Sequence, residues 1–210
     1  MNPNRRVLAL AGVVLPLAWT SAGEAKADGA YLQLEVGVMP RTEIDAQADE
    51  HFEVDNDPEP TATVAAGWAS SPWRAQLMLG RRYVNTDGIL HAPFQTNGSL
   101  TVWPVLIEVI RGLDLAPLTG LPLEAFGRLG GGVAYADLHD FGRGNGGDLV
   151  PAGSAQLGLG WRLRPHLTLL AGGRGLITGT FDSPGEETGE PHTRGHLAAA
   201  ELFAGLRFAF

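Results

Sequence analysis

The stretch AAAELFAGLRFAF, residues 198–210, has the pattern of a single β-strand with two different faces. Alanine, leucine and phenylalanine occupy every even position, whereas the odd positions include Glu201, Gly205 and Arg207. Successive side chains of a strand point to opposite faces, so a period of two indicates a strand rather than a helix. One face of this strand is therefore wholly apolar, and the other carries charge.

The same alternation recurs upstream and predicts seven further strands. Within residues 100–110, which are more uniformly apolar, we place Trp103, Val105, Ile107 and Val109 on the outer face because Glu108 then points inward. In the other segments, glycine, amide, hydroxyl or charged residues lie opposite the aliphatic ones. The seven segments are 31–38, 61–68, 73–83, 100–110, 123–135, 154–163 and 167–177.

The connections between these segments alternate in length. Short turns are expected near Ser70 and Pro165, and long polar links at 42–60, 85–97, 137–149 and 178–194. The link at 111–121 lies on the short side but is longer and apolar, and we interpret it as a folded-over turn. Short periplasmic turns and long outer loops are typical of outer-membrane barrels. The sequence therefore predicts an all-β fold, an eight-stranded antiparallel transmembrane β-barrel over residues 28–210.

The first 27 residues have the pattern of a cleaved signal peptide. Arg5 and Arg6 precede an apolar run at 7–19, and Ala25-Lys26-Ala27 offers the small-x-small cleavage pattern. The run has 13 residues, whereas a spanning helix needs about 20. An uncleaved amphipathic helix and a twin-arginine signal are the alternatives, and both match less well. We expect export and residence in the outer membrane.

Composition excludes several classes of protein. The 210 residues contain no cysteine, so disulfides, thiolate metal sites and cysteine nucleophiles are excluded. The formal net charge of −8 argues against a nucleic-acid partner, which requires a basic face. A soluble lipocalin-like barrel would carry apolar residues inside and polar ones outside, and the charges opposite the aliphatic faces disfavour it.

The predicted inner faces carry both signs of charge. The interior of an eight-stranded barrel is just wide enough for side chains to fill. We therefore expect a lumen filled by ion pairs, with a gated ion path through exchanging pairs as the alternative. The residues of this lumen network are Glu35, Arg74, Arg82, Glu108, Glu124, Arg128, Arg162, Arg174, Glu201 and Arg207.

Outward aromatic residues gather near the predicted short turns and the end of the chain. Aromatic girdles mark the interfaces of membrane barrels. The five residues expected at the periplasmic interface are Trp68, Trp73, Trp161, Phe208 and Phe210.

The ending LFAGLRFAF at 202–210 resembles the closing strand of the small outer-membrane β-barrel family that includes the OmpA transmembrane domain and the opacity porins. The glycine-rich segments 129–135 and 158–163 are similar to that family's fifth and sixth strands. The segment 171–176 is similar to its seventh-strand arginine motif, with glycines beside Arg174 in place of tyrosines. The resemblance implies contact with outer-membrane lipid and lipopolysaccharide, and recognition of Phe210 by the barrel assembly machinery.

The predicted loops and histidines give weaker functional signals. Eight carboxylates lie between Glu43 and Glu59 without a basic residue, which favours a solvated charge run over a Ca²⁺ or Mg²⁺ site. Only His192 and His196 are close in sequence, so no metal and no cofactor is expected. His166 with Ser154, and His139 with its neighbouring aspartates, are the only enzyme candidates, and no Gly-x-Ser-x-Gly elbow occurs.

These patterns predict a non-enzymatic barrel with a structural or surface-interaction role, which covers membrane integrity, adhesion and contact with the environment. A narrow ion or small-solute channel is the alternative. The sequence does not identify an extracellular ligand.

Overall fold

The structure is a computed structural model that describes residues 28–47, 51–53, 58–86, 98–141, 144–183 and 193–210. The predicted signal peptide, His192 and most of the acidic stretch 43–59 lie outside the described residues or have undescribed side chains. The elements are β1 (Gly29–Gln47), β2 (His51–Glu53), β3 (Glu59–Ser70), β4 (Trp73–Thr86), β5 (Gly98–Asp114), α1 (Ala116–Thr119), β6 (Leu123–Phe141), β7 (Gly144–Arg164), β8 (Leu167–Thr178), β9 (Phe181–Ser183) and β10 (Thr193–Ala209).

Eight of these strands form a closed antiparallel barrel, as the sequence predicts. Their order is β1-β3-β4-β5-β6-β7-β8-β10, and β10 pairs back onto β1. The closing ladder sets Leu34 opposite Leu206, while Leu34 also faces Val64 of β3. The short strands β2 and β9 pair only with the outer parts of β1 and β10. Closure leaves the eight long strands without a free edge.

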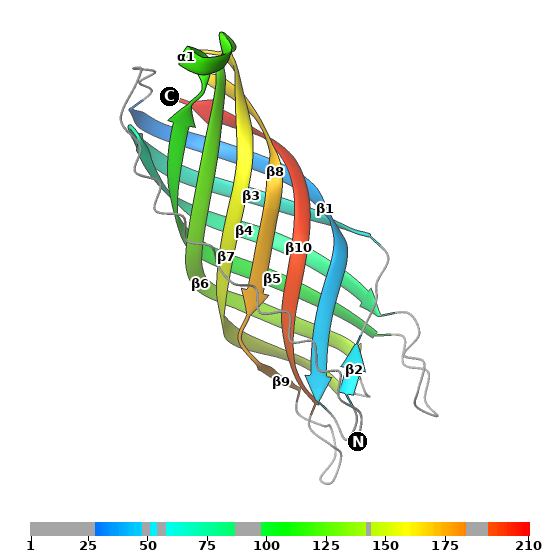
Figure 1. Cartoon of the computed structure of the whole chain (residues 1–210). Helices are drawn as coiled ribbons and strands as arrows, with labels where there is room; N and C mark the ends of the chain where they lie inside the picture. The colour runs from blue at the N-terminus through cyan, green and yellow to red at the C-terminus, as the bar shows by residue number, and fades with distance from the viewer. Residues whose placement is uncertain (1–27, 48–50, 54–57, 87–97, 142–143, 184–192) are drawn as a thin grey trace, which may run out of the picture.

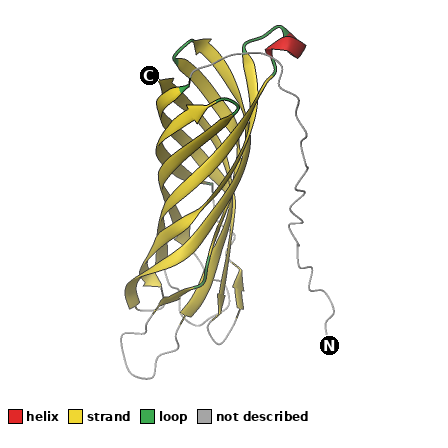
Figure 2. Ribbon diagram, turned by 90° about the vertical axis from the view of Figure 1, so that its left-hand side faces the viewer, coloured by secondary structure: helices red, strands yellow, loops and turns green. Residues whose placement is uncertain are grey.

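The two ends of the barrel differ (Figures 1 and 2). The one-turn helix α1 and Phe210 lie at one end, which we call the helix end. The strands β2 and β9 lie at the other, which we call the loop end. No helix among the described residues is long and apolar enough to span a bilayer.

Burial follows the predicted alternation along the middle of every long strand. On β1, the side chains of Leu32, Leu34 and Val36 are exposed, whereas those of Gln33 and Glu35 are buried. The assignment of β5 holds as well, because Ile107 is 67% exposed and Glu108 is fully buried. The apolar faces point outward and form an exposed belt around the barrel.

The alternation reverses toward the loop end, and there the prediction of a long loop at 137–149 was wrong. The β6–β7 ladder continues through Asp137 opposite Gly147 and Leu138 opposite Gly146. The inward side chains Leu138 and Val150 are buried and apolar, whereas Asp137 and His139 point outward. At the loop end, β6 therefore has the polar-out, apolar-in pattern of a soluble sheet, and its polar residues had suggested a loop.

The link at 111–121 is also resolved into regular structure. Residues up to Asp114 extend β5, and the one-turn helix α1 follows. The helix has Pro117 in its first turn and ends at Thr119, and Gly120 caps it with a φ of 69°, the left-handed conformation that glycine favours. The carboxylate of Asp114 accepts the backbone N–H of Ala116 at 3.0 Å. The extra length of the link is therefore a capped helical turn at the helix end.

Candidate functional site: the packed barrel interior

The inward side chains form four levels along the barrel axis. Starting from the helix end, these are a small set of ion pairs, a compact apolar cluster, a central charged network and a large apolar cluster. The expected buried arginine–glutamate pairs are present at the first and third levels, and two apolar levels accompany them. The apolar residues of these two levels share the inner faces with the charged ones, and many of them, such as Phe126, Met78 and Leu106, lie inside the expected strands.

At the first level, Glu124 of β6 lies between two arginines. Its Oε1 is 2.7 Å from a guanidinium nitrogen of Arg74 and 3.0 Å from one of Arg207. Beside it, Arg162 of β7 donates to Asp114 at 2.7 Å. Asp114 was missed in the sequence because it falls in the link that we interpreted as a turn.

The second level is the apolar cluster of Ile110, Phe126, Leu170 and Phe203. All four side chains are at least 95% buried. The ring of Phe203 lies under the guanidinium of Arg174 at 5.4 Å, and that of Phe126 under Arg128 at 5.7 Å. The rings of this cluster stack against two arginines of the central network.

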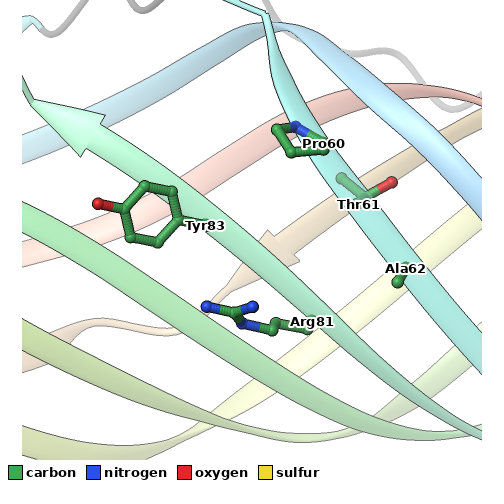
Figure 3. A pocket seen from close by; sticks show the side chains of 5 residues that line it. All are labelled: Pro60, Thr61, Ala62, Arg81 and Tyr83. Carbon is green, nitrogen blue, oxygen red and sulfur yellow. The ribbon is translucent and has the colours of Figure 1, made fainter.

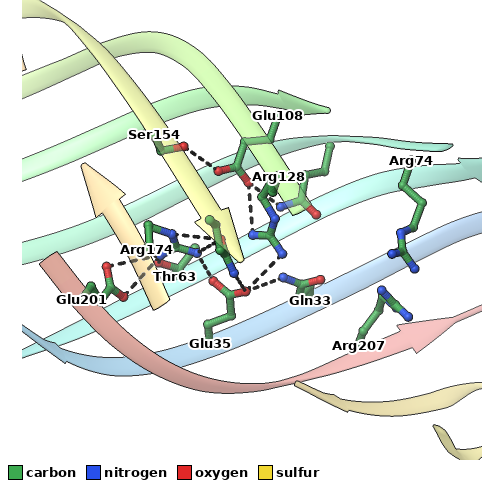
Figure 4. Close-up of polar contacts among 12 residues, drawn as sticks. Gln33, Glu35, Thr63, Arg74, Glu108, Arg128, Ser154, Arg174, Glu201 and Arg207 are labelled. Carbon is green, nitrogen blue, oxygen red and sulfur yellow. Dashed lines mark hydrogen bonds and ion pairs between the residues drawn. The ribbon is translucent and has the colours of Figure 1, made fainter. Parts of the chain in front are cut away.

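The central network joins three carboxylates, Glu35, Glu108 and Glu201, with three arginines, so its formal charges balance (Figure 4). Arg174 forms ion pairs with Glu35 and with Glu201, the latter at 3.3 Å. Arg128 bridges Glu35 at 3.3 Å and Glu108 at 3.2 Å, and Arg82 reaches Glu201 at 2.9 Å. Burial of charge is tolerated only with such partners. Figure 4 shows Arg74 and Arg207 apart from this cluster, with their guanidinium groups facing each other.

Neutral side chains complete the network. Glu108 also accepts hydrogen bonds from Gln76 at 2.6 Å and from Ser154 at 3.0 Å. Thr61 donates to Glu201 at 2.6 Å. Sequence reasoning did not single out these partners, although Gln76, Thr61 and Ser154 all stand at inward positions of the predicted strands. The buried hydroxyl of Tyr31 donates to Gln76 at 2.9 Å, and further neutral partners are Gln33, Thr63 and Gln156.

Glycines on the inner faces make room for the network. An added Cβ at Gly130 would lie 2.7 Å from Cγ of Glu108 and 2.9 Å from the hydroxyl of Ser154. At Gly37 it would lie 2.7 Å from the hydroxyl of Thr61. Part of the glycine-rich pattern of these strands is therefore a packing requirement of the charged level.

The fourth level is a large apolar cluster toward the loop end. Its members come from all eight long strands and from β9, and most are fully buried. The cluster comprises Met39, Ala65, Met78, Val84, Leu100, Val102, Leu106, Ala134, Ala136, Leu138, Val150, Ala152, Leu176, Phe181, Leu197 and Ala199.

The five predicted interface aromatics are all exposed on the outer surface, between 37% and 79%. They come from segments that end at the helix end: Trp68 and Trp73 flank the turn between β3 and β4, and Phe210 ends the chain. A second set, which the sequence analysis did not group, lies toward the loop end. Trp103 of β5 stands opposite Tyr135 of β6, and both rings are exposed.

The structure does not bring the enzyme candidates together into a catalytic set. Ser154 points inward and is bound to Glu108, whereas His166 is exposed in the turn after β7. His139 lies 3.4 Å from Asp137 on the outer face of β6. Among the described residues, no three histidine, aspartate or glutamate side chains are grouped so that they could hold a metal ion.

Comparisons with known proteins give likenesses of fold. No family model matches the chain, and no curated protein matches its sequence. Neisserial surface protein A has a similar structure at a TM-score of 0.57 and 18% identity, over 87% of this chain and 97% of that one. OprG from Pseudomonas aeruginosa matches at 0.54 and 13%, over 90% and 100%. The outer membrane protein AlkL, whose structure was determined in lipid bilayers, matches at a TM-score of 0.50 and 15% identity, over 91% of this chain and 95% of that one.

At these identities the likeness shows the fold and not the function. The matched chains are covered almost completely, and the match extends over most of this chain. Three observations indicate the same fold: the closed barrel with its exposed apolar belt, the closing strand at 198–210 and the likeness to these solved structures. The chain has the eight-stranded barrel fold of small outer-membrane proteins.

Proposed function

We propose that the protein is an outer-membrane barrel with a structural or surface-interaction role and no open pore. The exposed belt supports the membrane location, since a soluble protein rarely exposes an apolar surface of this extent. A cleaved signal over residues 1–27 and recognition of Phe210 by the barrel assembly machinery fit the same proposal. Lipid and lipopolysaccharide would then surround the belt, and an unidentified extracellular ligand would meet the loop end.

The observation that carries the proposal is the packing of the interior at four successive levels. An ion that crosses the barrel would first have to displace paired charges and then enter the aliphatic cluster that includes Leu100, Leu106 and Met78. Burial of an unpaired ion in such surroundings costs several kcal/mol or more. The apolar level therefore blocks conduction even when an ion pair of the central network opens.

Single-channel recording in planar bilayers tests this proposal. We expect the wild-type barrel to give no current steps at any voltage. Stepwise conductance of the folded barrel would contradict the closed-barrel proposal and favour the channel.

One observation favours the alternative of a narrow channel. The Nε and Nη1 atoms of Arg82 are buried and have no hydrogen-bond partner. Spare donors of this kind could pass an anion from one guanidinium to the next. The variant Glu201→Gln removes the negative charge that pairs with Arg82 and Arg174. It should therefore conduct ions if a path through exchanging ion pairs exists. We expect it to stay closed because the apolar level is unchanged.

A further inference from the structure

Two arginine–tryptophan pairs lie on the outer surface of the same two strands, β4 and β5. Trp73 stands opposite Arg111, whose guanidinium is 5.1 Å from the ring centroid. Toward the loop end, the guanidinium of Arg81 lies 5.6 Å from the centroid of Trp103. The order is reversed because the strands are antiparallel: β4 contributes the tryptophan at the helix end and the arginine at the loop end.

The two pairs bracket the apolar belt. From 73 to 81 on β4, and from 103 to 111 on β5, the outward residues between the pairs are alanine, leucine, valine and isoleucine. Eight residues of strand span about 27 Å, or roughly 20 Å across a membrane at a tilt near 40°. An apolar band of a membrane barrel is about 25 Å tall. The pairs therefore lie near the two margins of the belt, where lipid headgroups begin.

Arg81 is exposed on this surface. Within the part of the chain that the structure describes, its guanidinium stacks on Trp103 and forms no ion pair with a carboxylate. Next to it lies a hollow of about 320 Å³, to which β3 contributes Pro60, Thr61 and Ala62 and β4 contributes Arg81 and Tyr83 (Figure 3). Thr61 points inward to Glu201, so Pro60 and Ala62 form the outer wall on the β3 side.

Charge and position together select the occupant of this hollow. A guanidinium presents a rigid fork of N–H donors that matches phosphate oxygens, and stacking on an aromatic ring leaves that fork free. A cation on the lipid side of a barrel is costly at the midplane but nearly neutral at the margin, where it meets headgroups. A free phosphate ion would not require an apolar belt on one side of the site.

We propose that Arg81, held by Trp103 and flanked by Tyr83, binds the phosphate of an anionic lipid headgroup in the leaflet at the loop end. The proposal rests on the outer-membrane location put forward above. It assigns the headgroup site to three neighbouring strands: β4 provides the guanidinium as the donor, β5 provides Trp103, and the hollow beside Pro60 of β3 is the space for the headgroup.

Native mass spectrometry of the full chain in detergent micelles tests the proposal. The probes are diphosphoryl lipid A and the same glycolipid after dephosphorylation. Wild type should retain the phosphorylated probe about tenfold better, and Arg81→Gln should lose that preference. The matched control Arg164→Gln removes an exposed arginine at the helix end and should keep it. Arg81→Lys, which keeps the charge but not the fork, should fall between.

Three results would overturn the proposal: an unchanged preference in Arg81→Gln, an equal loss in Arg164→Gln, or release of the lipid by millimolar inorganic phosphate. The last would mean that the guanidinium binds free phosphate rather than a headgroup. Membrane fractionation separates this failure from that of the proposed function. A barrel found in the outer membrane that shows no preference for the phosphorylated probe would contradict only the lipid site. A protein found in the soluble fraction would contradict both the lipid site and the proposed outer-membrane function.

Discussion

At the scale of single residues, the central network depends on two arginines, Arg128 and Arg174, that each bridge two carboxylates. Arg128 connects Glu35 of β1 to Glu108 of β5, which lie far apart in the chain. The alternation of the sequence predicted that all three point inward. It could not predict which carboxylate meets which guanidinium, because these contacts cross the lumen and depend on how far the strands are staggered when the barrel closes.

Arg128→Met should lower the free energy of unfolding by about 3–5 kcal/mol, because it leaves two buried carboxylates short of a partner. Urea unfolding in phospholipid vesicles measures the change. Arg164→Met, at an exposed position, should change little. Equal stability of the two variants would mean that the buried pairs do not hold the barrel together.

Gly130→Ala and its neighbour Gly131→Ala form a matched pair. At Gly130 the new methyl would press on Glu108 and Ser154, whereas at Gly131, which faces outward, it would meet nothing within 4 Å. We expect Gly130→Ala to cost about 1–3 kcal/mol in the same unfolding assay, and Gly131→Ala to be neutral. A similar loss of stability at both positions would mean that the substitutions act through the backbone and not through contacts with the charged network.

At the scale of elements, the sequence predicted the strands well where the outer face is apolar and poorly beyond that belt. Leu138 alternates with its polar neighbours Asp137 and His139 just as regularly as Leu32 and Leu34 do with theirs, but with the faces exchanged. A strand prediction that relies only on outward apolar residues therefore stops where the polar and apolar faces exchange. The helix α1 escaped prediction for a different reason: a single turn is too short to show a helical period.

Asp114 ties α1 to the barrel through two contacts, the backbone N–H of Ala116 and the side chain of Arg162. Asp114→Ala removes both, whereas Asp114→Asn keeps an oxygen that can accept the backbone bond. Hydrogen exchange of the Ala116 amide should therefore speed up about tenfold in the alanine variant and much less in the asparagine variant. Equal acceleration in both would show that the ion pair, and not the backbone hydrogen bond, holds the turn.

At the scale of the whole molecule, the closure of the barrel is what allows its outer surface to be apolar. Every long strand is paired on both sides, so the backbone needs no water along the wall, and the belt can face lipid. Among the described residues, ion pairs and apolar clusters then occupy the inner face of the barrel. This combination distinguishes the protein from a lipocalin-like barrel, in which the apolar residues would line the inside at every level.

The most direct test is heat modifiability in the native membrane. Outer membranes from cells that express the full chain are run on SDS gels without and with boiling, alongside the soluble periplasmic fraction. A barrel whose edges are all paired resists SDS until it is heated. We expect a band in the outer-membrane fraction whose apparent size shifts on boiling. A band of unchanged size in the soluble fraction would contradict this expectation.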